Sequence, residues 1–255
     1  MGAVEAPLAL GRGIAAVRSP SQIDRDVDLQ FDRPPVGGLS TTGVLIGNPN
    51  ILSEVVVAYE TGYRQQIGRK VTLDLALFVD RRSRMIVESL QTPYLTFSPG
   101  PSLVVPVQTV NGMQGTTRGV EIAATWKPLR NWRLQTAYTR DDANLSAVPG
   151  YTLTEPPVWY WQTPRNTLYL RSSLDITRRW SIDSSFSWVS RIPSYPVPHY
   201  TRVDLRIARK IGEGGEISAG VRNLFDREHL EFISEDYIVS SLVPRDAYVK
   251  VMWRF

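Results

Sequence analysis

The sequence predicts an all-β fold: an antiparallel transmembrane β-barrel portion of about ten strands, a number within the range of bacterial barrels. Three observations lead to this prediction. Polar and apolar residues alternate with a period of two along the whole chain, whereas apolar stripes of helical period are nearly absent. The connections between these segments are short and long in alternation along the chain. No window approaches the ~18 consecutive apolar residues that a membrane-spanning helix needs.

The composition fits an ordered protein and limits the kinds of partner that the chain is expected to bind. Of 255 residues, 42% are hydrophobic and 21% charged, and the absence of cysteine excludes both a disulfide framework and a thiolate metal site. The formal charge of +4 could suit nucleic acid. However, no basic residue lies between Arg84 and Arg118, and the pair Arg178–Arg179 falls alone at an apparent turn. We therefore expect no nucleic-acid partner.

The alternation gives each predicted strand one apolar and one polar face. At the end of the chain, Val249, Val251 and Trp253 share one face, and Tyr248 and Lys250 share the other. Other segments repeat the pattern, and we expect strands near 13–20, 54–64, 71–90, 116–127, 132–142, 165–176, 180–191, 199–209, 216–225 and 246–255.

Alternation alone does not separate a membrane barrel from a soluble sandwich, because a sandwich also buries one face of each strand. The connections favour the barrel. Short ones are expected at Gln65–Lys70, Leu129–Asn131, Thr177–Arg179 and Gly212–Gly215. Long ones are expected at Leu29–Ser53, Thr92–Gln114, Asn144–Pro164, Ile192–Pro198 and Leu230–Arg245.

Several runs of residues resemble, in order, the landmarks of one family, and they cover nearly the whole chain. The runs are AVRSPSQIDRDV from Ala16, GNPNILSEVVVAYETGYR from Gly47, TRGVEIAATWKP from Thr117, VPHYTRVDLRIA from Val197, GVRNLFDREH from Gly220 and AYVKVMWRF from Ala247. In this order the chain resembles the C-terminal part of the β-barrel of TonB-dependent outer-membrane receptors.

The resemblance implies a location and a function. Receptors of this family take up ferric siderophores, cobalamin or similar scarce nutrients, through plugged barrels of about 22 strands. The resemblance implies a Gram-negative outer membrane, with short periplasmic turns and long extracellular loops. Residues 1–255 would be a barrel fragment without plug domain or signal peptide. Its partners would be outer-membrane lipid, the barrel-assembly machinery and, in an intact receptor, the TonB energising system and a small nutrient chelate.

The last strand has two interpretations. Val249, Val251, Trp253 and Phe255 resemble the C-terminal signal that barrel-assembly machinery recognises. The same stripe would equally suit a lipid-facing strand that ends in an aromatic belt. Both interpretations place Trp253 and Phe255 at the membrane interface.

A ligand site is expected where a long loop meets the strand ends. Trp159, Tyr160 and Trp161 lie on one long loop, with Arg118 and Arg140 near the ends of neighbouring strands. Aromatic and cationic groups together can hold an anionic, ring-bearing chelate. The alternative is an aromatic girdle accompanied by ordinary lumen-facing arginines.

No catalytic, metal or cofactor site is expected. His199 and His229 are the only histidines, without further ligands at metal-binding spacing. The acid pairs Asp141–Asp142 and Glu235–Asp236 fall at loop edges, where carboxylates are usually solvated.

Two alternative functions stay open at this point. A small closed barrel with omptin-like protease activity would need facing acid and histidine groups at one rim, and only His229 has acids beside it. A soluble β-rich binding protein would need a second layer over outward residues such as Trp188 and Leu205.

Overall fold

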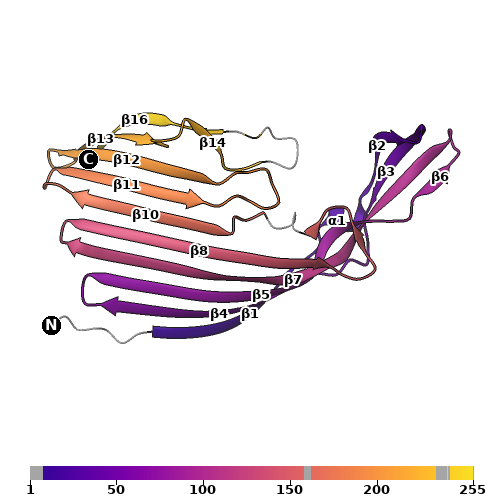
Figure 1. Ribbon diagram of the computed structural model, residues 1–255, viewed down its shortest axis with the longest axis horizontal. Helices are drawn as coiled ribbons and strands as arrows, with labels where there is room; N and C mark the ends of the chain where they lie inside the picture. The colour runs from indigo at the N-terminus through magenta and orange to yellow at the C-terminus, as the bar shows by residue number, and fades with distance from the viewer. Residues whose placement is uncertain (1–7, 158–161, 234–239, 241, 255) are drawn as a thin grey trace.

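The structure is a computed structural model that describes residues 8–157, 162–233, 240 and 242–254. Within these residues fourteen strands join in one sheet, and ten of them follow one another as neighbours in a single curved wall (Figure 1). These ten are β1 (Leu8–Arg18), β4 (Glu54–Ile67), β5 (Val71–Leu90), β7 (Ser102–Leu129), β8 (Trp132–Ala147), β10 (Asn166–Asp175), β11 (Trp180–Val189), β12 (Tyr200–Ile211), β13 (Gly215–Arg222) and β16 (Asp246–Trp253).

The antiparallel all-β fold predicted from the sequence is confirmed. Strand β5 has the predicted bounds of 71–90, and most other strands differ from their predicted bounds by a few residues. Strand β1 begins earlier than expected, because Ala9 and Gly11 continue its pairing with Tyr63 and Thr61 of β4.

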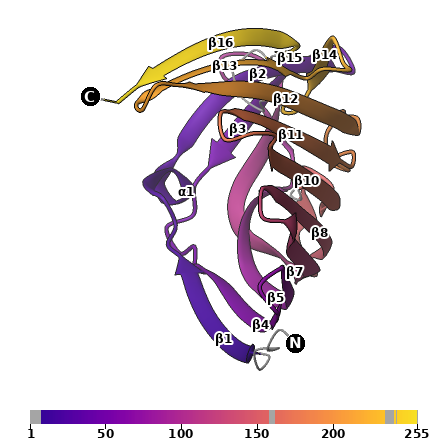
Figure 2. The same ribbon diagram turned by 90° about the vertical axis from the view of Figure 1, so that its left-hand side faces the viewer.

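The wall is open along its two sides. Along the order of the sheet, β1 is hydrogen-bonded to β4 and β16 to β13, and the described residues contain no pairing between β1 and β16. Figure 2 shows the resulting curved, unclosed wall. Each outer strand therefore presents one unpaired row of backbone donors and acceptors.

Short turns connect the strands at one end of the wall, here called the turn end. These turns occupy residues 68–70, 130–131, 176–179 and 212–214, as predicted. Gly68 and Gly212 have φ values of 57° and 59°, a backbone conformation that glycine adopts without strain. The other end, here called the loop end, carries the longer connections.

Register and alternation together give the wall a charged face and an apolar face. Across β10, β11 and β12, Leu170 pairs with Phe186 and Phe186 with Val203. One residue along, Arg171 pairs with Ser185 and Ser185 with Asp204. In a membrane barrel the polar face lines the interior and the apolar face contacts lipid.

Aromatic rings cover glycines on the charged face. A Cβ added at Gly119 would lie 2.3 Å from the ring of Phe78, and one at Gly220 would lie 2.7 Å from the ring of Tyr248. These pairs fill the space that a missing side chain leaves in a strand. This packing of rings on glycines allows β5 to lie close to β7, and β13 close to β16.

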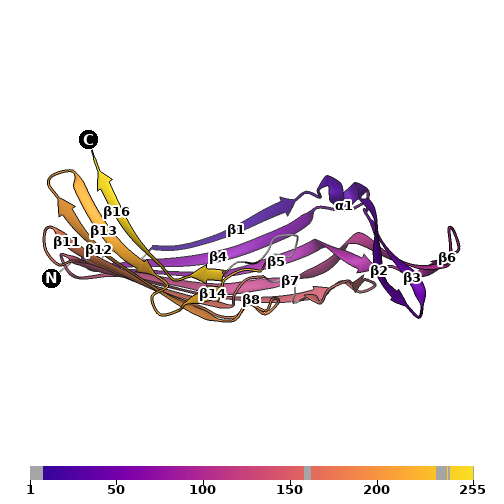
Figure 3. The ribbon, with the colours of Figure 1, turned by 90° about the horizontal axis from the view of Figure 1, so that it is seen from above.

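A lobe extends beyond the wall at the loop end, where the sequence predicted only long loops (Figure 3). It contains β2 (Asp28–Val36), β3 (Leu39–Ile46) and β6 (Tyr94–Thr96), and β7 begins at Ser102 within the predicted loop Thr92–Gln114. That prediction was wrong in detail. Strand β3 runs parallel to β7, and this pairing satisfies backbone groups that a loop would leave to water.

Proline explains why these lobe strands were missed. Pro34 and Pro35 lie in β2 at an irregularity of its pairing with β3, between the pairs Arg33–Thr41 and Val36–Leu39, so their missing donors cost no ladder bond there. Pro106 lies inside β7 and still accepts a hydrogen bond of 2.9 Å from the Gln91 N–H. The loop-end part of β5, from Met85 to Leu90, also belongs to the lobe, and the buried cluster of the lobe consists of Val87, Val110 and Met113.

The remaining elements are short. Helix α1 (Gln22–Asp26) was not predicted, and it begins at a capping box between Ser21 and Asp24. Strands β9 (Thr152–Leu153), β14 (Glu228–Leu230) and β15 (Leu242–Pro244) lie in the other long connections. Among the described residues, no helix has the length and apolar character required to cross a membrane.

Candidate functional site

The charged face carries a ladder of ion pairs between neighbouring strands. Its best-connected member is Arg206 on β12, whose guanidinium donates to Asp183 on β11 at 2.9 Å and to Glu216 on β13. Asp183 also accepts a hydrogen bond from the hydroxyl of Ser173 on β10. One arginine thus links three strands.

Further ion pairs recur from one side of the wall to the other, four between neighbouring strands and two within a single strand. All of them lie at positions that alternation assigns to the charged face. They are Arg12–Glu60, Arg64–Asp74, Arg82–Asp80, Arg171–Asp183, Arg202–Asp204 and Arg222–Asp246. The charges of this face are therefore largely matched by neighbours in the same sheet.

A buried asparagine closes the ladder at the loop end. Asn223 follows β13, is fully buried and has a φ of 54°, a left-handed conformation that asparagine tolerates better than most residues. Its backbone N–H donates to Asp204 at 3.0 Å, and Asp204 also accepts two hydrogen bonds from Arg202. Its side-chain amide donates to the carbonyl of Val243 at 3.3 Å.

His229 belongs to the same cluster. Its ring stacks on Tyr200 with centroids 4.5 Å apart, and its Nδ1 lies 3.1 Å from the Asn223 amide nitrogen. Its Nε2 lies 2.9 Å from Glu231, and Asp226 lies 3.2 Å from Nδ1. With 8% exposure, this histidine of β14 packs against Tyr200 of the wall, and the described residues contain no group suited to a metal ion.

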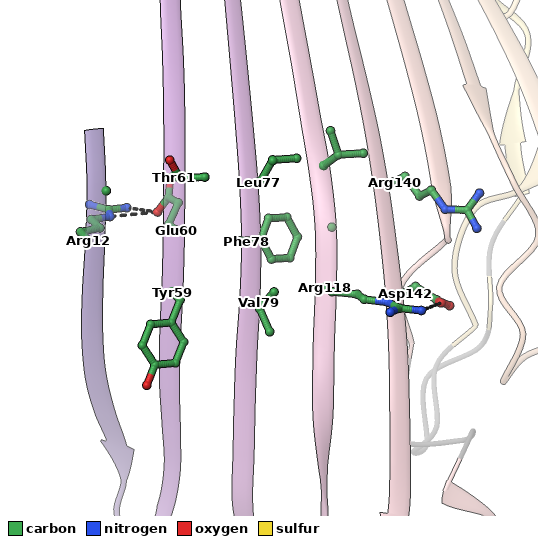
Figure 4. Close-up of a pocket in the computed structure, with 13 residues that line it drawn as sticks. Arg12, Tyr59, Glu60, Thr61, Leu77, Phe78, Val79, Arg118, Arg140 and Asp142 are labelled. Atoms are coloured by element: carbon green, nitrogen blue, oxygen red, sulfur yellow. Dashed lines mark hydrogen bonds and ion pairs between the residues drawn. The ribbon is translucent and has the colours of Figure 1, made fainter. Parts of the chain in front are cut away.

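The two arginines of the predicted ligand site lie in one hollow on the wall, within β7 and β8 and not at the strand ends as expected (Figure 4). Arg118 comes from β7 and Arg140 from β8, and the hollow of about 790 Å³ is also lined by Tyr59, Leu77 and Val79. Alternation places both arginines on the same face as Val120 and Ile122, the apolar face.

Asp142 supplies negative charge to this hollow. It lies 3.9 Å from the Arg118 guanidinium and 3.5 Å from Nε of Arg165. Its neighbour Asp141 occupies the opposite, charged face by alternation. The two adjacent carboxylates therefore lie on opposite faces of the wall.

Some predicted residues fall outside the described part of the chain. These are Trp159, Tyr160 and Trp161 of the ligand-site prediction, Phe255 of the terminal stripe and the pair Glu235–Asp236. Val249, Val251 and Trp253 lie on the apolar face of β16 and are 72%, 68% and 54% exposed. Their position agrees with both interpretations of the terminal stripe. It does not test whether the stripe is an assembly signal.

Sequence reasoning missed the ion-pair ladder and the Asn223 cluster. The alternation signalled a polar face, but pairing partners such as Arg206 and Glu216 depend on strand register. Register is set by turn geometry and packing across the sheet. The run GVRNLFDREH did mark the Asn223 cluster, without showing that Asn223 is its buried centre.

Comparison with known proteins agrees with this geometry. Solved structures with similar folds include a mutant of the ferric enterobactin receptor PfeA from Pseudomonas aeruginosa, at a TM-score of 0.74 and 16% identity. The siderophore receptor PirA from Acinetobacter baumannii gives 0.73 at 16% identity, and the copper transporter OprC gives 0.63 at 16% identity. No curated protein sequence matches the chain.

The alignments cover 98% of this chain but only 38% of the PfeA chain, 39% of the PirA chain and 38% of the OprC chain. This chain thus spans about two fifths of the length of these proteins. Their fold is that of receptors and transporters, and it fits better than an omptin-like enzyme or a soluble β-rich protein. Residues 22–224 match the family described as TonB dependent receptor-like, beta-barrel, and the chain belongs to that family.

Proposed function

We propose that this chain forms part of the barrel wall of a TonB-dependent receptor in the outer membrane of a Gram-negative bacterium. The observation that carries the proposal is the two-faced wall, with its matched charges on one face and its apolar band on the other. Such a wall suits a lipid surface on one side and a hydrated interior on the other.

The proposed activity is uptake of a scarce nutrient chelate. Ferric siderophores are the favoured class, because the similar structures include siderophore receptors and a complex of the PfeA receptor with enterobactin. Uptake requires the remainder of a receptor, a TonB energising system and prior insertion by the barrel-assembly machinery. The two free edges of the wall, on β1 and β16, are where further strands would pair.

Arg118 and Arg140 are the proposed ligand contacts within the described residues, and Trp159, Tyr160 and Trp161 are proposed as further contacts. The hollow is lined by three cations, Arg12, Arg118 and Arg140, by two acids, Glu60 and Asp142, and by an exposed aromatic ring at Tyr59. An anionic chelate with aromatic rings would meet complementary groups there. Because the apolar face would contact lipid, the placement of both arginines there favours an ordinary girdle at the membrane boundary over a site in the barrel interior, and a binding test separates the two.

Uptake of a radiolabelled ferric siderophore by the source bacterium tests the activity. Iron-starved cells with the gene intact should accumulate the label, and deletion should reduce accumulation of at least one siderophore. Recovery of the protein in the detergent-resistant outer-membrane fraction tests the location. An unchanged uptake profile together with recovery in a water-soluble fraction would contradict the proposal.

The double variant Arg118→Gln/Arg140→Gln tests the ligand site. We expect siderophore affinity to fall roughly 10-fold or more, since each charge-assisted hydrogen bond contributes about 1.5–3 kcal/mol. A matched control is Arg33→Gln/Arg191→Gln, which removes the same charge from exposed residues at the loop end. Equal affinity in both variants would leave the girdle interpretation in place.

A further inference from the structure

The turn end of the wall collects basic residues that are far apart in the sequence. They lie in the four short turns or directly beside them, and one follows the last strand. We call this set the turn rim; it consists of Arg69, Lys70, Lys127, Arg130, Arg178, Arg179, Arg209, Lys210 and Arg254, and all nine are exposed. Figure 1 shows these turns side by side at one end of the wall.

The turn rim lacks matching acids. Within the described residues, no member of the rim makes an ion pair, although arginines on the charged face such as Arg206 do. Lys70 donates to the carbonyl of Pro128 at 3.3 Å, and the Arg209 guanidinium lies 5.3 Å from the ring centre of Trp180. The acids in the same turns and their flanks are Asp175, Glu213 and Glu216. Glu216 lies opposite Lys210 in the register but makes its ion pair with Arg206.

Exposed apolar side chains lie beside these cations on the wall. Trp126 is 49% exposed, Trp180 39% and Trp253 54%, and all three belong to the apolar face by register. Leu129 and Ile176, at the edges of two turns, are 56% and 50% exposed. Tryptophan at the end of an apolar band is typical of the level of lipid headgroups.

From these observations we propose that the turn rim binds the anionic headgroups of phospholipids in the periplasmic leaflet. The inference rests on the proposed function, since it requires the wall to cross the outer membrane with its turn end toward the periplasm. Arginine donates paired hydrogen bonds to a phosphate, and long basic side chains reach the headgroups while their stems cover apolar surface. The rim thereby acts as an electrostatic anchor for the turn end.

The experiment uses the full chain, diluted from urea into vesicles of phosphatidylcholine or of an equal mixture of phosphatidylcholine and phosphatidylglycerol. Insertion is read from protection against protease and from flotation with the vesicles. We expect insertion into both lipids, with an apparent affinity roughly 10- to 100-fold higher for the anionic vesicles at low salt. The preference should fade as salt is raised, because ions screen exposed charges.

Two variants with equal charge changes locate the effect. The rim variant, Arg130→Gln/Arg178→Gln/Lys210→Gln, changes one cation in each of three turns. The control, Arg33→Gln/Arg191→Gln/Arg227→Gln, changes three exposed arginines at the loop end that make no ion pair within the described residues. The proposal predicts that the rim variant loses most of the preference for phosphatidylglycerol and that the control keeps it.

Each other outcome has a definite meaning. Insertion with no lipid preference, or an equal loss in both variants, overturns the turn rim as a headgroup site and leaves the proposed function standing. Failure of the unmodified chain to insert into either lipid contradicts the proposed membrane location and, with it, this inference.

Discussion

The charged face and the turn rim are both rich in arginine, but their arginines have different surroundings. On the charged face, Arg206 lies between Asp183 and Glu216 on neighbouring strands. At the turn rim, Arg178 and Arg179 lie in a turn that contains no acidic side chain, and neither makes an ion pair within the described residues. Strand register, not residue type, therefore decides whether a cation finds a partner inside the protein.

This difference assigns different roles to the two regions. An arginine that links acids on two strands contributes to the stability and alignment of the wall. An exposed arginine without a partner contributes little to folding and is available to an external anion. Substitutions on the charged face should therefore change the folding free energy, and substitutions at the turn rim should change the lipid preference.

The largest effect is expected at Asn223, which anchors the charged face at the loop end. Asn223→Ala should lower the free energy of unfolding by about 2–4 kcal/mol, because buried hydrogen bonds are lost and alanine is strained at positive φ. Urea unfolding of vesicle-inserted chain measures this. Asn223→Gly, which relieves the backbone strain alone, should recover part of the loss. A loss below about 0.5 kcal/mol in Asn223→Ala would show that Asn223 does not stabilise this cluster.

Arg206→Met should have the next largest effect. It leaves Asp183 and Glu216 without their shared cation, and we expect a loss of about 1–2 kcal/mol, since the side chain is 30% exposed and solvent screens the pair. A double-mutant cycle with Asp183→Asn gives the coupling between the two strands. Additive effects would show that the ion pair does not align them.

In the lobe, the surroundings of the acid Glu88 disfavour its charged form. Partial burial raises the pKa of the Glu88 carboxyl, and the neighbouring Glu155 carboxylate raises this pKa further. Because the folded lobe then binds the proton more tightly than the unfolded chain does, its stability should fall as pH rises from the ordinary glutamate pKa through the raised one. Glu88→Gln should remove this dependence.

Hydrogen exchange measures that lobe effect directly. The Thr154 N–H donates to the Glu88 carbonyl at 3.1 Å, so its protection, corrected for the intrinsic rate at each pH, follows the local stability. Protection that increases as pH rises through the same interval would contradict the assignment.

The smallest folding effect is expected at the turn rim. Arg178→Gln should leave the free energy of unfolding in phosphatidylcholine vesicles unchanged within error while weakening the preference for phosphatidylglycerol. A loss of stability as large as that of Arg206→Met would show that the rim arginines are structural, and the contrast between the two regions would fail.

Much of the wall was predictable because its signals are local. Alternation over Val71–Leu90 and turn residues such as Gly212 depend on neighbours in the sequence, and both were predicted correctly. The lobe was not, since Pro34, Pro35 and Pro106 suggested loops whereas tertiary pairing accommodates them. The turn rim could not be predicted from the sequence, because its cations come together only when the turns lie side by side in the folded wall.

The central claim, a wall with one lipid-facing and one water-facing side, can be tested by a single scan. The chain has no cysteine, so single cysteines at residues 247–251 of β16 carry spin labels at unique sites. In vesicles, the account predicts that labels at Ala247, Val249 and Val251 are accessible to oxygen dissolved in lipid, and that labels at Tyr248 and Lys250 are accessible to a water-soluble reagent. Equal access of the water-soluble reagent along the whole segment would contradict the claim.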